Sequence, residues 1–167
     1  MHTTAKIVLV ALASACVTAL VMLLVLSSST KHPMPSDHPP PNNEDNVEVV
    51  DSEEEKMVAP DGGSALSLQY TKDVTIDLER ETATLYFKNA GKSLQDAVLF
   101  LVIEDTVILQ SGLLPAGNAV RSLSLPSGGT PLHPGIYEGV FCVQFYHSDG
   151  TSAQLNSRIE GITVTVQ

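Results

Sequence analysis

Residues 132–146 read LHPGIYEGVFCVQFY, and this stretch decides the fold. Its last twelve residues, Gly135–Tyr146, follow a turn signal and are rich in aromatic and β-branched side chains, which predicts one long strand. Side chains alternate between the two faces of a strand, so Glu138 and Gln144 mark the row that faces solvent. The other row is predicted to face the core and consists of Tyr137, Gly139, Phe141, Val143 and Phe145.

Short apolar alternations of the same kind fill the chain on both sides of this strand. They predict further strands at 66–70, 74–78, 82–89, 97–104, 106–113, 119–125 and 162–166. Turn residues such as Asn89-Ala90-Gly91 and Glu104-Asp105 separate them, and no segment has the period of an amphipathic helix. Residues 64–167 are therefore predicted to form an all-β domain, an antiparallel β-sandwich of about seven strands. The absence of helical crossovers excludes a parallel α/β architecture.

Parity assigns inward rows to two more of these strands. In 82–89 the polar Thr84 and Lys88 mark the outer face, and in 162–166 Thr163 and Thr165 do so. The predicted core residues are Ala83, Leu85, Phe87, Ile162, Val164 and Val166.

The entrance to the long strand carries the most specific local signal. Leu132-His133-Pro134-Gly135-Ile136-Tyr137 has the pattern L-x-P-G-x-Y, which resembles the tyrosine corner of immunoglobulin-like (Ig-like) and fibronectin-type folds. The resemblance implies structural roles for two residues. The Tyr137 hydroxyl would bond the backbone a few residues upstream, and Leu132 would fill the core beneath it.

The outward rows of two strands carry apolar side chains where polar ones are expected. In an Ig-like order these strands, 97–104 and 135–146, are neighbours, so their outer faces join into one patch. An exposed apolar patch of this kind marks a partner surface, which makes it the predicted interaction face. Two alternatives are open: the 66–70 strand, a loop or the preceding linker covers the patch, or a bulge reverses the parity. The patch consists of Val98, Phe100, Val102, Val140, Cys142 and Tyr146.

A separate segment near the N-terminus predicts a membrane anchor. Residues 7–26 read IVLVALASACVTALVMLLVL, twenty positions without a charge, enough for a helix of about 30 Å that matches the bilayer core. The first six residues are short and lightly basic and are expected to be cytoplasmic, with the C-terminal domain outside the cell membrane. Two alternatives are a signal peptide cleaved after Ser29 and a lipoprotein signal ending at Cys16.

The stretch between anchor and domain, residues 27–63, predicts a linker. Positions 31–63 hold six of the ten prolines and no aromatic residue, and within 32–63 nine acidic residues stand against one base, Lys56. Such a composition lacks the apolar surface that offsets chain entropy, so the linker is expected to be disordered and extended. The net charge of −10 lies mostly here, and the domain carries −4 without a basic stripe, which excludes nucleic acid as a partner.

The layout of the domain resembles a bacterial family. Ser111-Gly112-Leu113-Leu114-Pro115-Ala116-Gly117, followed by Pro134-Gly135, is similar to small membrane-anchored proteins of Gram-positive bacteria, whose function is unassigned. These resemble single Ig-like sandwiches behind a signal anchor and an acidic, Pro-rich stalk. The likeness covers about residues 70–167 and implies a fold and a location, but no catalytic or binding residue. In this chain Ala116 separates the proline and glycine of the first turn, which implies a longer turn.

Motifs for catalysis are absent from the sequence. There is no G-x-S-x-G elbow, C-x-x-C pair, H-E-x-x-H motif or glycine-rich phosphate loop, so no enzyme activity, cofactor or metal is predicted. Asp96, Glu104 and Asp105 are the weak alternative, as a Ca²⁺ site at one end of the sandwich. The two cysteines, Cys16 and Cys142, lie in the anchor and the domain, so they are not expected to form a disulfide.

The sequence therefore predicts a non-enzymatic module with Ig-like architecture, anchored in the membrane and displayed outside the cell. Its expected role is to bind a protein partner, or itself, through the apolar outer face, or to contribute to the structure of the envelope. The alternative is a regulator or inhibitor subunit of an extracytoplasmic enzyme or membrane complex.

Overall fold

The computed structural model describes residues 39–50, 53–61, 63–127 and 132–167. The predicted cytoplasmic residues 1–6, the predicted anchor 7–26 and the first part of the predicted linker lie outside this range. Within the described residues, no helix is long and apolar enough to cross a membrane.

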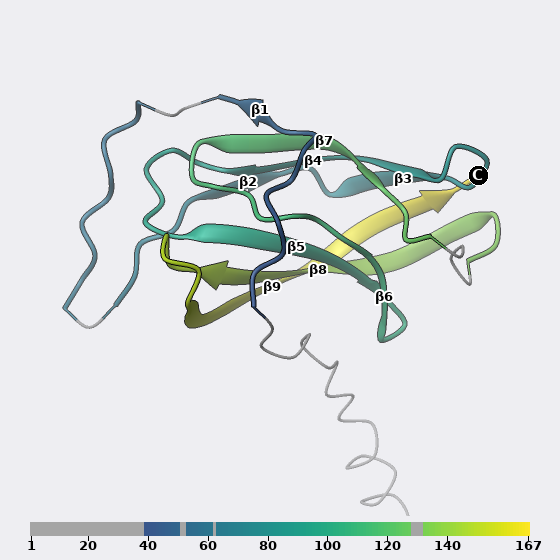
Figure 1. Cartoon of the computed structure of the whole chain (residues 1–167). Helices are drawn as coiled ribbons and strands as arrows, with labels where there is room; N and C mark the ends of the chain where they lie inside the picture. Colours follow the sequence, from purple (N-terminus) through teal and green to yellow (C-terminus); the bar gives the residue numbers. More distant parts are fainter. Residues whose placement is uncertain (1–38, 51–52, 62, 128–131) are drawn as a thin grey trace, which may run out of the picture. The chain divides into compact units, whose positions relative to one another are not determined.

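The described part of the chain is all-β, as predicted (Figure 1). Eight of its strands overlap those expected from the sequence, and two of them, β4 and β8, match to the residue. The strands are β1 (Glu48–Val49), β2 (Leu68–Tyr70), β3 (Asp73–Asp77), β4 (Thr82–Asn89), β5 (Asp96–Ile103), β6 (Thr106–Gln110), β7 (Asn118–Ser124), β8 (Gly135–Tyr146) and β9 (Ser152–Val166).

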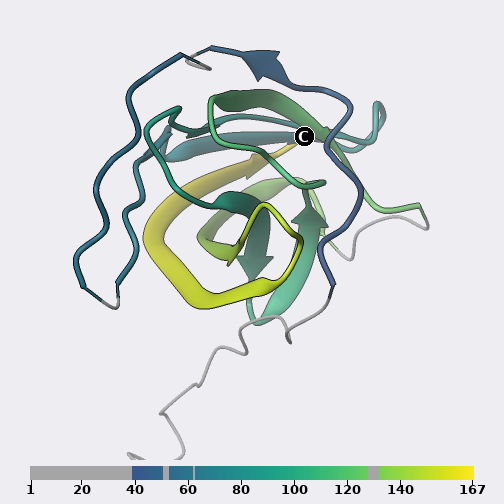
Figure 2. The ribbon, with the colours of Figure 1, turned by 60° about the vertical axis from the view of Figure 1, so that its left-hand side comes forward.

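The strands form one curled sheet with mixed pairing. Its order is β1-β7-β4-β3-β9-β8-β5-β6, and β2 pairs with β4 beside this path. Most pairs are antiparallel, but β3 and β9 run parallel, which differs from the purely antiparallel arrangement predicted. Figure 2 shows how β9 bends around the sheet. This curl brings the end of the path at β6 toward β7.

β9 is ten residues longer at its N-terminal end than the sequence predicted. Ala153, Leu155 and Ile159 pack partly against the core, whereas the core residues after the bend are Ile162, Val164 and Val166, so the inward parity changes between Ile159 and Ile162. The register with β8 shifts at this point, and Gly161 has a φ of +72°. A bulge of this kind inserts one residue, which explains why a single alternation could not describe the whole strand.

The main core lies between the inward rows that the parity predicted. Every residue predicted to be inward on β4 and on the end of β9 is buried, as are Phe141, Val143 and Phe145 of β8. Phe141 contacts Phe87 edge to face, with ring centroids 6.2 Å apart, and contacts Tyr70 at 6.3 Å. Burial of each phenylalanine stabilises the fold by about 1.5–3 kcal/mol.

The predicted apolar interaction face is not an exposed surface. Val98, Phe100, Val102, Cys142 and Tyr146 are each at most 5% exposed and form a second buried cluster, against which Leu113 and the half-buried Val140 pack. Pairing explains part of this burial, because Gln110 of β6 lies opposite Phe100 and Arg158 of β9 lies opposite Cys142.

Gln144, predicted to face solvent, is also buried. Its side-chain oxygen accepts a hydrogen bond from the Tyr146 hydroxyl at 3.1 Å. Parity placed these residues on the correct face of β8, but it could not show that this face is covered.

Candidate binding groove at the seam of the sheet

The two ends of the curled sheet meet at a seam between β6 and β7. Contacts join the two strands, yet among the described residues they do not pair as a ladder. The seam is instead bridged by an extended segment, residues 42–50, which is called the strap below. The strap belongs to the stretch predicted as a disordered linker, so the ordered domain begins before residue 64.

The first half of the strap is bound to the chain that follows β6. The Glu44 amide donates to the Leu113 carbonyl at 2.9 Å, and the Leu113 amide donates to the Asn42 carbonyl at 2.9 Å. The Glu44 carboxylate accepts the Gly112 amide at 2.7 Å. This approach is close: a Cβ on Gly112 would lie 2.6 Å from the Glu44 backbone, so the position requires glycine.

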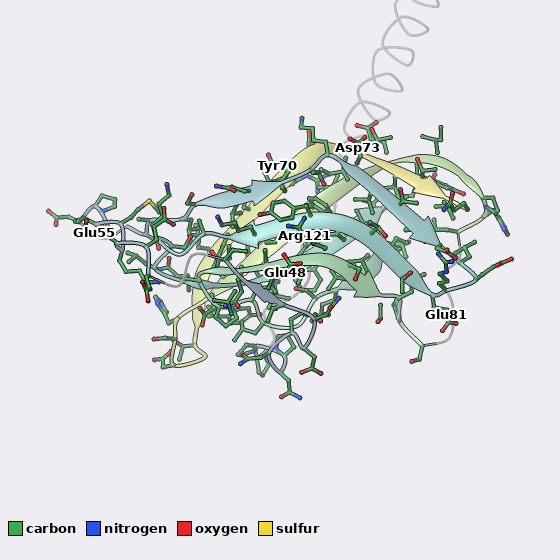
Figure 3. All side chains as sticks on the ribbon, turned by 90° about the horizontal axis from the view of Figure 1, so that it is seen from above. Glu48, Glu55, Tyr70, Asp73, Glu81 and Arg121 are labelled. Carbon is green, nitrogen blue, oxygen red and sulfur yellow. The ribbon has the colours of Figure 1, made fainter. Side chains whose placement is uncertain are left out.

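The second half of the strap is bound to β7. β1 pairs antiparallel with the start of β7, and the Asn46 side-chain amide donates to the Ser122 carbonyl and hydroxyl, both at 2.9 Å. Glu48 accepts from Arg121 at 2.9 and 3.0 Å, and Figure 3 shows these two side chains together above the sheet. Both are half-exposed or more, so this ion pair contributes little, at most about 1 kcal/mol.

A groove of about 560 Å³ lies along the seam between the strap and the sheet. β6 and the residues after it line one side, the strap lines the other, and Ser124 and Pro126 complete the lining. Val107 of β6 is 44% exposed and is one of the apolar side chains that line the groove. The groove is lined by Pro41, Asn42, Asn43, Glu44, Asp45, Val107, Leu109, Gln110, Ser111, Gly112, Ser124 and Pro126.

β6 presents one free backbone edge at this groove. It pairs with β5 on one side, and no strand of the described chain pairs with its other side. An unpaired edge presents the N–H and C=O groups of every second residue, which accept an added strand. A bulge at Ile108, between the pairs Leu101–Leu109 and Val102–Val107, shortens the regular part of this edge.

The electrostatic character of the groove is acidic. Glu44 and Asp45 belong to its lining, and no lysine or arginine is among the described residues that line it. Glu104 and Asp105 form the two-residue turn that leads into β6, both with positive φ, as the twist of a tight hairpin requires. The acidic residues that line the groove therefore belong to the strap, whereas the Glu104–Asp105 turn is not part of the lining.

The structure separates the acidic residues considered as a Ca²⁺ site. Asp96 begins β5, whereas Glu104 and Asp105 follow its other end, eight residues away, or about 26 Å along a strand. Asp96 instead accepts the Ala116 amide at 3.2 Å. Burial raises the pKa of its carboxyl, while this hydrogen bond and the charge of Lys56 partly oppose the shift. No cluster of three or more potential metal ligands occurs in the part of the chain that is described.

The remaining residues singled out from the sequence have structural environments. The Tyr137 hydroxyl donates to the His133 carbonyl at 3.0 Å, four residues upstream, and Leu132 packs partly against the core. Cys142 is a buried free thiol, and burial raises its pKa while the Arg158 charge partly opposes the shift. A thiol of this kind stays protonated and is a weak nucleophile.

The strap, which lines the candidate groove, was not predicted from the sequence. Its signal was the run Asn46-Val47-Glu48-Val49-Val50, in which β-branched residues alternate with polar ones, the pattern of a short strand. Val47 packs partly against the core. The surrounding acids and prolines concealed this signal, because their composition is typical of disorder.

Comparison with known proteins adds no further constraint: no family model, no curated protein and no solved structure matches the chain.

Proposed function

We propose that this protein is a non-enzymatic binding module that is tethered to a membrane and binds a protein partner outside the cell. The observation that carries the proposal is the seam groove, an open, acidic channel beside an unpaired strand edge. Binding sites on β-domains use such edges because the backbone groups supply affinity without a deep pocket. The apolar face of β5 and β8 is not part of the proposal, since it is buried.

The membrane part of the proposal is supported by the sequence of residues 7–26. The strap modifies the expected geometry, because it begins at residue 42, so residues 27–41 alone separate the anchor from the first docked residue. At about 3.1 Å per extended residue this spacer reaches roughly 45 Å. The full linker of 27–63 would reach more than twice as far.

The Ig-like classification is retained as part of the proposal. Two observations support it. β5 pairs with β8 along the full length of β5, as expected for the corresponding strands of an Ig-like sandwich, and the Tyr137–His133 hydrogen bond has the form of a tyrosine corner. The curled, mixed sheet would then be a variant of that sandwich.

The binding site is tested by photo-crosslinking in intact cells. A photoreactive amino acid replaces Val107 in the groove, and the matched control replaces Val58, which is 91% exposed and outside the groove. We expect a discrete adduct from position 107 and none from position 58. Equal labelling from both positions, or no adduct at position 107 in cells that contain the protein, contradicts the groove as the binding site.

The location is tested on sealed cells with added protease. We expect loss of the β-domain, detected with an antibody against residues 64–167, while a cytoplasmic marker stays intact. A domain that survives in sealed cells but is cut after lysis contradicts the extracytoplasmic location.

A further inference from the structure

We infer that the seam groove takes an extended peptide with alternating basic and apolar side chains, which adds to the free edge of β6 as a further strand. This inference rests on the proposed function and names the class of partner that the groove fits. Three features of the groove carry it: a backbone edge, a half-exposed apolar side chain and acidic residues around them.

The backbone edge determines the conformation of the partner. β6 spans Thr106–Gln110, about 17 Å of strand, and no strand of the described chain pairs with its free side. The strap shows that this seam accommodates extended backbone, because Asn42 and Glu44 exchange main-chain hydrogen bonds with Leu113 in a parallel bridge. A second extended segment can occupy the β6 side by the same kind of bond.

The side chains of the groove determine the sequence of the partner. Val107 offers an apolar contact in the wall, which suits an aliphatic side chain. Asp45 is exposed in the opposite wall, and Glu44 belongs to the same wall. Alternate side chains of an added strand point the same way, so apolar residues on one face and lysine or arginine on the other complement these walls.

A short peptide suits this edge better than a second copy of the chain. The bulge at Ile108 interrupts the regular ladder of β6, and acidic residues precede it, so two such edges do not form a long, flat pair. The domain is also acidic as a whole, which disfavours self-association and favours a basic partner.

The test uses a fluorescein-labelled octapeptide, (Lys-Val)₄, and the full chain in a nonionic detergent, with binding measured by anisotropy. We expect saturable binding of (Lys-Val)₄ and none of (Glu-Val)₄. Val107→Thr is expected to weaken binding roughly fivefold, and Asp45→Lys roughly threefold or more. The matched controls Val58→Thr and Asp61→Lys, both at exposed positions outside the groove, should leave the affinity unchanged.

Strand addition is separated from simple charge attraction with two N-methylated peptides. One carries methyl groups on the amides of the lysines, the other on those of the valines. An added strand directs only every second N–H toward β6, so we expect one methylated peptide to lose binding and the other to retain it. Equal binding of both, or loss of both, overturns strand addition.

The remaining outcomes also decide the inference. If (Lys-Val)₄ does not bind, or binds equally well to Val107→Thr and Asp45→Lys, the partner class is wrong. Unchanged thermal unfolding of both variants shows that the domain remains folded. Dimerisation that depends on Val107 would show that a second copy of the chain occupies the β6 edge, and it would refute the inference that a peptide binds there. A crosslink from position 107 in cells together with failure of the peptide leaves the groove as the binding site and refutes only the peptide class.

Discussion

At the scale of single residues, close packing along β8 limits the size of the side chain that position 139 can hold. Gly139 lies in the inward row, where Gly is required because Val164 and Leu101 occupy the space of a side chain. A Cβ at this position would lie 2.9 Å from a Val164 methyl and 3.1 Å from a Leu101 methyl. Both neighbours are fully buried, so they have little room to move.

We therefore expect Gly139→Ala to destabilise the fold by about 1–3 kcal/mol through overpacking. Urea unfolding followed by circular dichroism measures this change. The matched control is Gly135→Ala on the same strand, where the nearest atom is 3.6 Å away and the residue is exposed. A change within about 0.5 kcal/mol is expected there. Equal effects of the two substitutions would contradict the packing described.

Asp96 gives the fold a dependence on pH. Burial raises the pKa of its carboxyl above the ordinary 3.8, so between these two values the folded state binds more protons than the unfolded state. The contribution of Asp96 to stability is then fully present below the ordinary pKa and declines as the pH rises through the raised value.

We expect Asp96→Asn to remove this part of the pH dependence. The stability of the variant, measured relative to the unsubstituted chain, should therefore increase between pH 3.5 and pH 7. Urea unfolding at several pH values measures the difference. The control is Asp61→Asn at an exposed position, which should leave the profile unchanged. A relative stability that falls as the pH rises would show that the hydrogen bond from Ala116 outweighs burial.

At the scale of elements, the strap depends on a small number of polar contacts. Two of its residues pair as a strand, and hydrogen bonds of Asn42, Glu44, Asn46 and Val50 hold the rest. The Glu44 carboxylate is its strongest single contact, because a charged acceptor meets a backbone N–H at 2.7 Å.

We expect Glu44→Ala to weaken docking of the strap by about 1.5–3 kcal/mol, the range for a hydrogen bond to a charged group. Hydrogen exchange should become faster at Leu113 and along the start of β7, while the protection of β8 is unchanged. Glu55→Ala is the control, since this exposed side chain points away from the sheet in Figure 3. Equal exchange in the two variants would show that the strap does not depend on Glu44.

At the scale of the whole domain, the strap protects the end of the sheet. In the described part of the chain, β1 pairs with the start of the outer β7 edge and Asn46 bonds Ser122 further along it. Open edges of this kind pair with other chains, and native proteins cover them.

Deletion of residues 42–50 from the full chain should therefore cause association that depends on concentration. Analytical ultracentrifugation in detergent measures it, with deletion of 53–61 as the control. Monomeric behaviour of the 42–50 deletion at all concentrations would contradict a protective role.

The sequence predicted the positions of the strands better than it predicted which strand faces are covered by other parts of the chain. The alternation in β4 and β8 predicted their bounds and inward rows, because polar residues in the other row of each strand mark which row is inward. It could not show that Phe100 and Cys142 are covered, since their neighbours come from distant parts of the chain. The bulge at Gly161 reversed the parity of β9 and concealed most of that strand.

The candidate groove could not be predicted for a similar reason. In the sequence, each acidic residue of the strap resembles part of a solvated linker. In the fold, Glu44 accepts a hydrogen bond from the Gly112 amide, and Glu48 forms an ion pair with Arg121. Such pairings arise only once the sheet curls and brings its two ends together.

The place of the strap between the N-terminal residues and the sheet has a mechanical consequence. Any tension applied to the chain before residue 42 reaches the domain through the strap, and it loads the Asn42–Leu113 contact before those of Asn46 and Glu48. The contacts would break one after another at low force, and each freed residue would add roughly 3.3 Å of slack. The strap would then detach and extend before any force reaches the core.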